Sequence, residues 1–106
     1  MVEYQVLDKE GPFAALKLKG ELVGDISSQD LKGALERHYV DDGVREILID
    51  LTDLSEISLE GVAILLELWR ESGRRGKEFT VRGAHGQVEE KLQITGALKP
   101  LMRDQT

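Results

Sequence analysis

The segment "SEISLEG", from Ser55 to Gly61, brings hydroxyl and carboxylate groups to the start of an apolar helical pattern. A helix start exposes unpaired backbone amides and a partial positive charge, so a serine hydroxyl, a carboxylate or a phosphate group is stabilised there. Ser58 is placed to be the N-cap of that helix, and Glu60 falls in its first turn. A helix start alone explains these residues, and the same position would also suit a regulatory phosphate or a bound partner.

Several acidic residues lie near the preceding strand in the sequence: Asp41, Asp42, Asp50, Asp53 and Glu56. A magnesium site needs several oxygen ligands that converge on one ion. These acids come from one strand exit and from the loop before that strand. We therefore interpret them as turn residues and solvated residues at the edge of the sheet, and the sequence predicts no metal site.

The histidines and glycines form no catalytic pattern either. His38 and His85 lie on different predicted elements, and neither has a serine or a metal ligand at a telling spacing, so both are predicted at the surface. The 11 glycines form no phosphate-binding loop and no nucleophile elbow. Because no nucleophile, base and oxyanion-stabilising group can be named together, the sequence predicts a protein that is not an enzyme and needs no cofactor.

Length and composition limit the possible classes of protein. The chain has 106 residues, the size of one domain, so residues 1–106 are predicted to form a single unit. The net charge of −6 repels nucleic-acid phosphates and anionic membrane surfaces, so neither is an expected partner. No apolar run approaches the roughly 20 residues of a membrane helix. We expect a cytoplasmic protein with no direct membrane insertion, and the absence of cysteine excludes disulfides and thiolate chemistry.

The strands that would position "SEISLEG" are predicted from short apolar runs. Residues 4–7 and 13–19 flank the turn signal "DKEGP" and should form an antiparallel hairpin that ends at Gly20. "VREILIDL", from Val44 to Leu51, has the composition of a central parallel strand covered on both faces, followed by "TDLSEIS" as a loop. "KEFTVRG" is a further strand, and "LKPLMRD" could add a last one.

Three helices are predicted between and after these strands. The first lies in "DISSQDLKGALERHYVDDG", with Asp25, Ser27 and Ser28 as N-cap candidates. The second runs from about Leu59 to Ser72, has an apolar stripe that includes Trp69, and is stopped by Gly73 in a left-handed conformation. The third lies in "QVEEKLQITG".

The order of these elements predicts an α/β fold. It is a small mixed β-sheet with an N-terminal antiparallel hairpin, later strands that are parallel, and about three helices as crossovers. In open sheets of this class the functional crevice lies at the carboxyl ends of the strands. "TDLSEIS" leaves the central strand at that end, so the helix start after it is the expected functional surface.

The chain resembles the STAS domain, the module shared by sulfate transporters and bacterial anti-sigma-factor antagonists. The resemblance rests on "LKGEL" (Leu18–Leu22), on "ILIDLTDLSEIS" running into "GVAILLEL", and on "LQITGAL" (Leu92–Leu98). It implies a protein-interaction module whose partner is a kinase-type anti-sigma factor or another regulatory protein. In such antagonists the kinase phosphorylates a serine in a D-S-S-G or D-S-T-G segment at the start of this helix, and the phosphate blocks partner binding.

The phosphorylation segment departs from this pattern. Without gaps, it falls on Ser58, Leu59, Glu60 and Gly61, so Leu59 takes the phosphoacceptor position and only the glycine is kept. A slip of one residue would place Ser58 on the acceptor position, but it would lose the register of the strand and of Gly61; we prefer the ungapped alignment. The acid usual after "GEL" is replaced by Val23, and the next candidate, Asp25, is displaced.

The resemblance therefore favours an anti-sigma-antagonist-like interaction module whose switch at Leu59 is lost, or has moved to Ser58 or Ser55. Leu59 would offer an apolar anchor to a protein partner, beside the permanent charge of Glu60. Two alternatives stay open: an accessory subunit of a transport system, and a domain that senses a nucleotide or an anion at the helix start. The apolar stripe of the second helix could also serve a weak homodimer.

Overall fold

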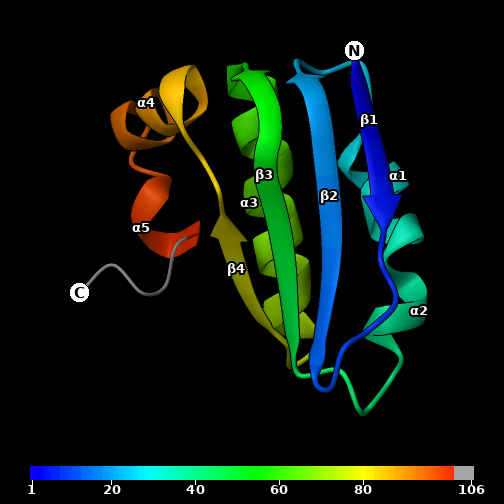
Figure 1. Ribbon diagram of the computed structural model, residues 1–106. Helices are drawn as coiled ribbons and strands as arrows, with labels where there is room; N and C mark the ends of the chain where they lie inside the picture. Colours follow the sequence, from blue (N-terminus) through cyan, green and yellow to red (C-terminus); the bar gives the residue numbers. More distant parts are fainter. Residues whose placement is uncertain (102–106) are drawn as a thin grey trace.

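The protein is a four-stranded mixed sheet with helices packed along it, as the computed structural model shows for residues 1–101 (Figure 1). The sheet has the order β1-β2-β3-β4. β1 pairs with β2 in antiparallel fashion, and the pairs β2–β3 and β3–β4 are parallel. The strands are β1 (Val2–Val6), β2 (Phe13–Leu22), β3 (Glu46–Ile57) and β4 (Glu78–Arg82). The predicted mixed sheet, with its N-terminal hairpin and parallel later strands, is confirmed.

Five helices occur within the described residues, three of them with seven residues or more. They are α1 (Ser28–Ala34), α2 (Glu36–Tyr39), α3 (Leu59–Arg74), α4 (Gly86–Ile94) and α5 (Leu98–Leu101). Figure 1 shows α1, α2 and α3 behind the sheet, whereas α4 and α5 lie beside β4. The predicted strand in "LKPLMRD" is wrong for residues 98–101, which are helical, and its last residues lie outside the described part.

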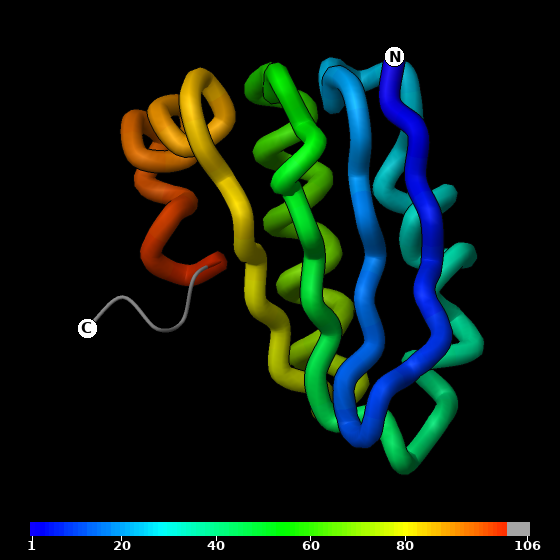
Figure 2. Tube along the Cα trace, viewed as in Figure 1, coloured from blue at the N-terminus to red at the C-terminus, as the bar shows by residue number. Residues whose placement is uncertain are grey.

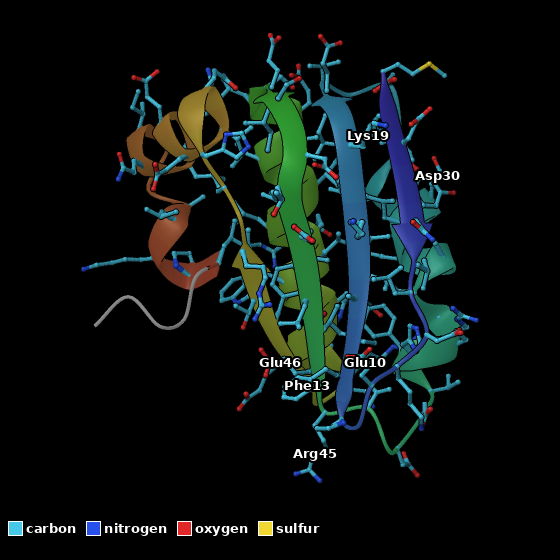
Figure 3. The ribbon with its side chains drawn as sticks, viewed as in Figure 1. Glu10, Phe13, Lys19, Asp30, Arg45 and Glu46 are labelled. Carbon is cyan, nitrogen blue, oxygen red and sulfur yellow. The ribbon has the colours of Figure 1, made fainter. Side chains whose placement is uncertain are left out.

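The core lies between the sheet and α3. Ile47, Ile49 and Leu51 of β3 point into it and are fully buried, while Leu48 and Asp50 between them are only half-buried. β3 was predicted to be covered on both faces, and this is wrong, because α1, α2 and α3 all lie on one side. An apolar run does not reveal this alternation, since Leu48 is as apolar as its inward neighbours. Figure 3 labels Phe13 and Glu46, which are register partners on β2 and β3 near the end where both strands begin.

β2 and β3 are longer than the sequence predicted. Residues 52–57 of the segment "TDLSEIS" are strand rather than loop, because β3 stays paired with β2 up to Leu22 and Ile57. Gly20 does not end β2. It adopts a positive φ of 95°, and the register shifts between Gly20 and Glu21. The bulged pairing carries both strands to the place where α3 begins.

The helices also differ in detail from their predicted form. α3 continues past Gly73 to Arg74, and Gly76 takes the left-handed conformation with φ of 74°. Trp69, predicted on the buried stripe, is exposed, while Val62, Leu65 and Leu68 are buried.

His38 was predicted at the surface, but it is buried, and its Nε2 lies 2.9 Å from the Leu7 carbonyl oxygen. The side chain is held there by a contact with a residue far away in the sequence. Its spacing within the helix gives no sign of that partner.

Candidate functional site

The start of α3 lies where β2 and β3 end side by side. Leu22 and Ile57 are register partners, and the Ser58 backbone N–H donates to the Leu22 carbonyl oxygen at 3.0 Å. Figure 1 shows these strand ends at the same edge of the sheet as the start of α4. The parallel pairing of β2 and β3 thus brings residues 22–25 and 57–61 to the end of the sheet where these strands finish, which is where open α/β sheets commonly carry their functional crevice.

Ser58 is the N-cap of α3, as the sequence predicted. Its Oγ accepts a hydrogen bond from the Gly61 backbone N–H at 3.2 Å, and its backbone is extended, with φ of −98° and ψ of 176°. Hydrogen bonds from the Glu60 backbone N–H and from the Ser58 hydroxyl hold the pKa of the Glu60 carboxyl below its ordinary value. The Ser58 hydroxyl therefore serves both as acceptor and as donor within the first turn.

Gly61 lets α3 pack directly against the end of β2. It is buried, and a Cβ atom at this position would lie 2.3 Å from the Leu22 carbonyl oxygen and 2.6 Å from Ile57 Cγ1. Real Cβ atoms essentially never come that close to other atoms. The glycine that the ungapped alignment preserves is therefore required by packing at this position.

Leu59 projects into solvent at the first position of α3, with 63% of its surface exposed. Val23, which follows the end of β2, is 39% exposed. The next residue, Gly24, has a φ of 97°, and a Cβ there would lie 3.3 Å from Glu60 Cβ. The loop after β2 therefore packs against the first turn of α3 through Gly24 and Glu60.

Two of the predicted site residues make their contacts elsewhere. Ser55 Oγ donates to the Gly20 carbonyl oxygen at 2.9 Å, across the bulge between β3 and β2. Asp25 Oδ2 lies 3.9 Å from the Met1 amino nitrogen. Asp25 is not the cap of α1, because Ser27 takes that role and forms a capping box with Asp30. Neither residue shares the hydrogen-bond network of Ser58 and Glu60.

Gln87, which sequence patterns do not single out, fixes the end of β3 on the side away from β2. The Gln87 side chain accepts from the Ile57 backbone N–H at 2.9 Å and donates to the Ile57 carbonyl oxygen at 3.0 Å. β4 does not reach Ile57, because the last β3 residue paired with β4 is Asp50. Gln87 thus takes the place of a β4 residue, and the residue just before Ser58 is held from both sides.

The turn into α4 provides a second contact of this kind. His85 Nε2 lies 2.8 Å from the Thr52 carbonyl oxygen. Gly83 has a φ of 80°, and a Cβ there would lie 2.9 Å from the Thr52 backbone nitrogen. Close backbone approach at Gly83 therefore lets the turn follow the edge of β3 beyond β4.

The acidic residues near β3 are engaged separately. Asp41 accepts from Lys9 Nζ and from the Gly43 backbone N–H, whereas Asp50 accepts from the Thr52 backbone N–H. No cluster of three or more histidine, cysteine or acidic side chains that could hold a metal ion occurs in residues 1–101. Over the same residues, no helix combines the length and the apolar character needed to cross a bilayer.

Comparison with solved structures finds the same fold in regulatory and transport proteins. An anti-sigma factor antagonist from Mycobacterium paratuberculosis superposes with a TM-score of 0.69 and 19% identity, over 96% of this chain and 83% of that one. A sulfate transporter family protein from Wolinella succinogenes gives a TM-score of 0.72 and 16% identity, over 88% and 74%. The phosphorylated Bacillus cell fate determinant SpoIIAA gives 0.68 and 19%, over 94% and 88%.

The sequence comparisons define the family. A search of curated protein sequences returned no significant match. The STAS domain family, however, matches residues 4–103, nearly the whole chain. This match covers β2, β3 and the start of α3, where the segments that resemble the family lie. The protein belongs to the STAS domain family.

Proposed function

We propose that this protein is a regulatory interaction module of the anti-sigma-antagonist type, which binds a protein partner through the start of α3. Leu59 is the apolar anchor, and the module acts without phosphorylation at that position. The observation that carries the proposal is the exposure of Leu59 at the first position of α3, between the Ser58 cap and the tightly packed Gly61. We further propose that the module is not an enzyme, because its polar groups at this edge are engaged in holding the helix start.

The surroundings of Leu59 suit a binding surface. Leu59 itself makes little contact with the protein, whereas the residues on either side of it are fixed by the Ser58 cap and by the packing of Gly61. Because the backbone on which Leu59 stands is already ordered, a partner that covers it has only the leucine side chain to immobilise. Burying a leucine side chain contributes about 1.5–3 kcal/mol, which is enough for a substantial part of a regulatory interaction.

Leu59→Asp is expected to weaken partner binding about tenfold, the equivalent of about 1.4 kcal/mol. An aspartate at a helix start is favourable for the helix, so the variant should stay folded while it loses the apolar contact. The partner is captured from extracts of the source cell with the wild-type protein and identified by mass spectrometry. Its affinity for each variant is then measured by titration.

Val40→Asp is the matched control. Val40 is also 63% exposed and also lies at a helix end, but it follows α2, far from the start of α3 (Figure 1). Its variant should bind the partner as the wild type does. Equal affinities of the Leu59→Asp variant and the wild-type protein would contradict the proposal.

We expect no phosphate at Ser58 or Ser55 after incubation with a partner kinase and ATP. Leu59 has no hydroxyl, and the Ser58 hydroxyl is bonded to the Gly61 N–H and the Glu60 carboxylate. A phosphate at Ser58 would also add nearly two negative charges beside Glu60. Intact-mass and peptide mass spectrometry provide the measurement, and a Leu59→Ser variant tests whether a hydroxyl at this position suffices for modification. Phosphate found at Ser58 in the wild-type protein would overturn the ungapped alignment.

A second candidate is an accessory subunit of a transport system. The similarity in fold to the Wolinella sulfate transporter family protein supports this candidate. The genes that neighbour this one separate the two functions, because transporter components favour the second and sigma-regulatory kinases favour the first. Sensing of a free anion at the start of α3 is less well supported, because the Glu60 carboxylate already accepts from the first-turn N–H and the Ser58 hydroxyl.

A further inference from the structure

The outer edge of β1 is an unpaired strand edge. β1 lies at one margin of the sheet and pairs only with β2 among the described residues (Figure 2). Its sequence, "VEYQV", contains none of the prolines or lysines that commonly block such an edge, and its pairing with β2 has no bulge. Tyr4, at its centre, is 44% exposed.

The pairing with β2 determines which backbone groups point outward. Glu21 N donates to the Met1 carbonyl oxygen, and Leu7 N donates to the Ala15 carbonyl oxygen. In an antiparallel pair, hydrogen-bonded and non-hydrogen-bonded residues alternate. The N–H and C=O groups of Glu3 and Gln5 therefore point toward β2, like those of Met1 and Leu7. The N–H and C=O groups of Val2, Tyr4 and Val6 point away from the sheet.

We propose that this edge pairs with β1 of a second copy of the chain, in antiparallel fashion about a two-fold axis at Tyr4. Tyr4 then lies opposite Tyr4 of the second copy, and Val2 lies opposite Val6. Every outward N–H and C=O group of these residues finds a partner in this register. The two sheets join into one continuous sheet, with the same surface contributed by each copy.

Charge selects this register over its neighbours. With Tyr4 at the axis, Glu3 of each copy lies opposite the uncharged Gln5 of the other, and in its own chain Glu3 is the register partner of Lys19 (labelled in Figure 3). A register centred on Glu3 would set two glutamates directly opposite each other, which is destabilising. A register centred on Gln5 would leave outward groups of Val2 unpaired. The Tyr4 register avoids both costs.

The dimer is transient, because a five-residue strand pair buries less surface than stable interfaces do. This surface is distinct from the apolar stripe of α3, where Val62, Leu65 and Leu68 are already buried. The inference also does not depend on the proposed partner of Leu59, since it concerns only the edge of β1.

Gln5→Glu tests the register. In the dimer this substitution sets a second carboxylate opposite Glu3 on both sides of the axis, so the dissociation constant should rise about tenfold. In the monomer the new carboxylate lies opposite Lys17 of the same chain, so the melting temperature should not fall. Sedimentation analysis at rising protein concentration gives the dissociation constants. The double variant Glu3→Gln/Gln5→Glu restores the opposed pair and should dimerise like the wild type.

Amide hydrogen exchange by NMR identifies the surface itself. The amides of Val2, Tyr4 and Val6 should exchange more slowly as the protein concentration rises, while those of Glu3 and Gln5 stay protected at all concentrations. A wild-type protein that remains monomeric throughout overturns the proposal. So does a dimer in which these three amides gain no protection, or one in which Gln5→Glu has no effect.

Discussion

Replacing Gly61 with alanine is expected to lower the free energy of unfolding by about 3 kcal/mol, the upper part of the range for overpacked sites. The added Cβ would lie 2.3 Å from the Leu22 carbonyl oxygen. That oxygen cannot simply move aside, because it accepts the hydrogen bond from the Ser58 N–H. α3 must therefore shift away from β2, which disturbs the cap and the strand end together.

Gly73→Ala is the matched control in the same helix. Apart from the chain neighbours of Gly73 and the nearby backbone of its own helix, no atom lies within 4 Å of a Cβ placed there, and the residue is exposed. Alanine there should raise the free energy of unfolding by about 0.8–1 kcal/mol, because it is the better helix former. Urea unfolding followed by circular dichroism measures both variants. If the two alanines change stability by the same amount and in the same direction, the close packing of Gly61 is not what stabilises this helix start.

Gln87→Ala is expected to cost about 2 kcal/mol of stability. The substitution removes two hydrogen bonds to Ile57 and leaves a partly buried backbone N–H and C=O without partners, each worth roughly 1–3 kcal/mol when fully desolvated. The expected loss lies at the lower end of the combined cost of the two backbone groups, because water can reach them at the edge of the sheet. The loss should appear both in urea unfolding and in faster exchange of the Ile57 amide.

Two further variants separate the hydrogen bonds from general effects on α4. Gln93→Ala changes an exposed residue of the same helix and should leave stability within about 0.5 kcal/mol of the wild type. Gln87→Glu keeps the acceptor for the Ile57 N–H but loses the donor to the carbonyl oxygen, so its stability should lie between those of the wild type and the alanine variant. A wild-type exchange rate for the Ile57 amide in Gln87→Ala would show that the contact does not hold the strand end.

Local patterns were enough to predict most of the fold. The hairpin, the order of elements and the helix after "SEIS" follow from apolar periodicity and turn residues, and Ser58 was identified as a cap from its position before an apolar helical run. The extent of the strands could not be predicted, because Thr52–Ile57 contains polar residues at exposed positions and reads as a loop. Its strand conformation depends on pairing with β2, which is a contact between residues far apart in the sequence.

The candidate site, too, was predictable from the sequence only in part. The residue types at Ser58, Leu59, Glu60 and Gly61 were enough to expect a capped helix start without a hydroxyl at the acceptor position of the family. Their environment was not predictable, since nothing near Gln87 indicates that its amide bonds to Ile57, and nothing near Gly61 indicates how closely Leu22 approaches.

The sequence by itself determined which chemical groups this protein can offer at the start of α3: a cap, a carboxylate, an apolar side chain and a glycine. Only the tertiary structure decided that Leu59 faces solvent while its neighbours are engaged, that one face of the sheet is left without α1, α2 and α3, and that the outer edge of β1 is unpaired. The physical reason is that propensity and capping act within a few residues, whereas exposure and pairing depend on which distant segments the chain brings together.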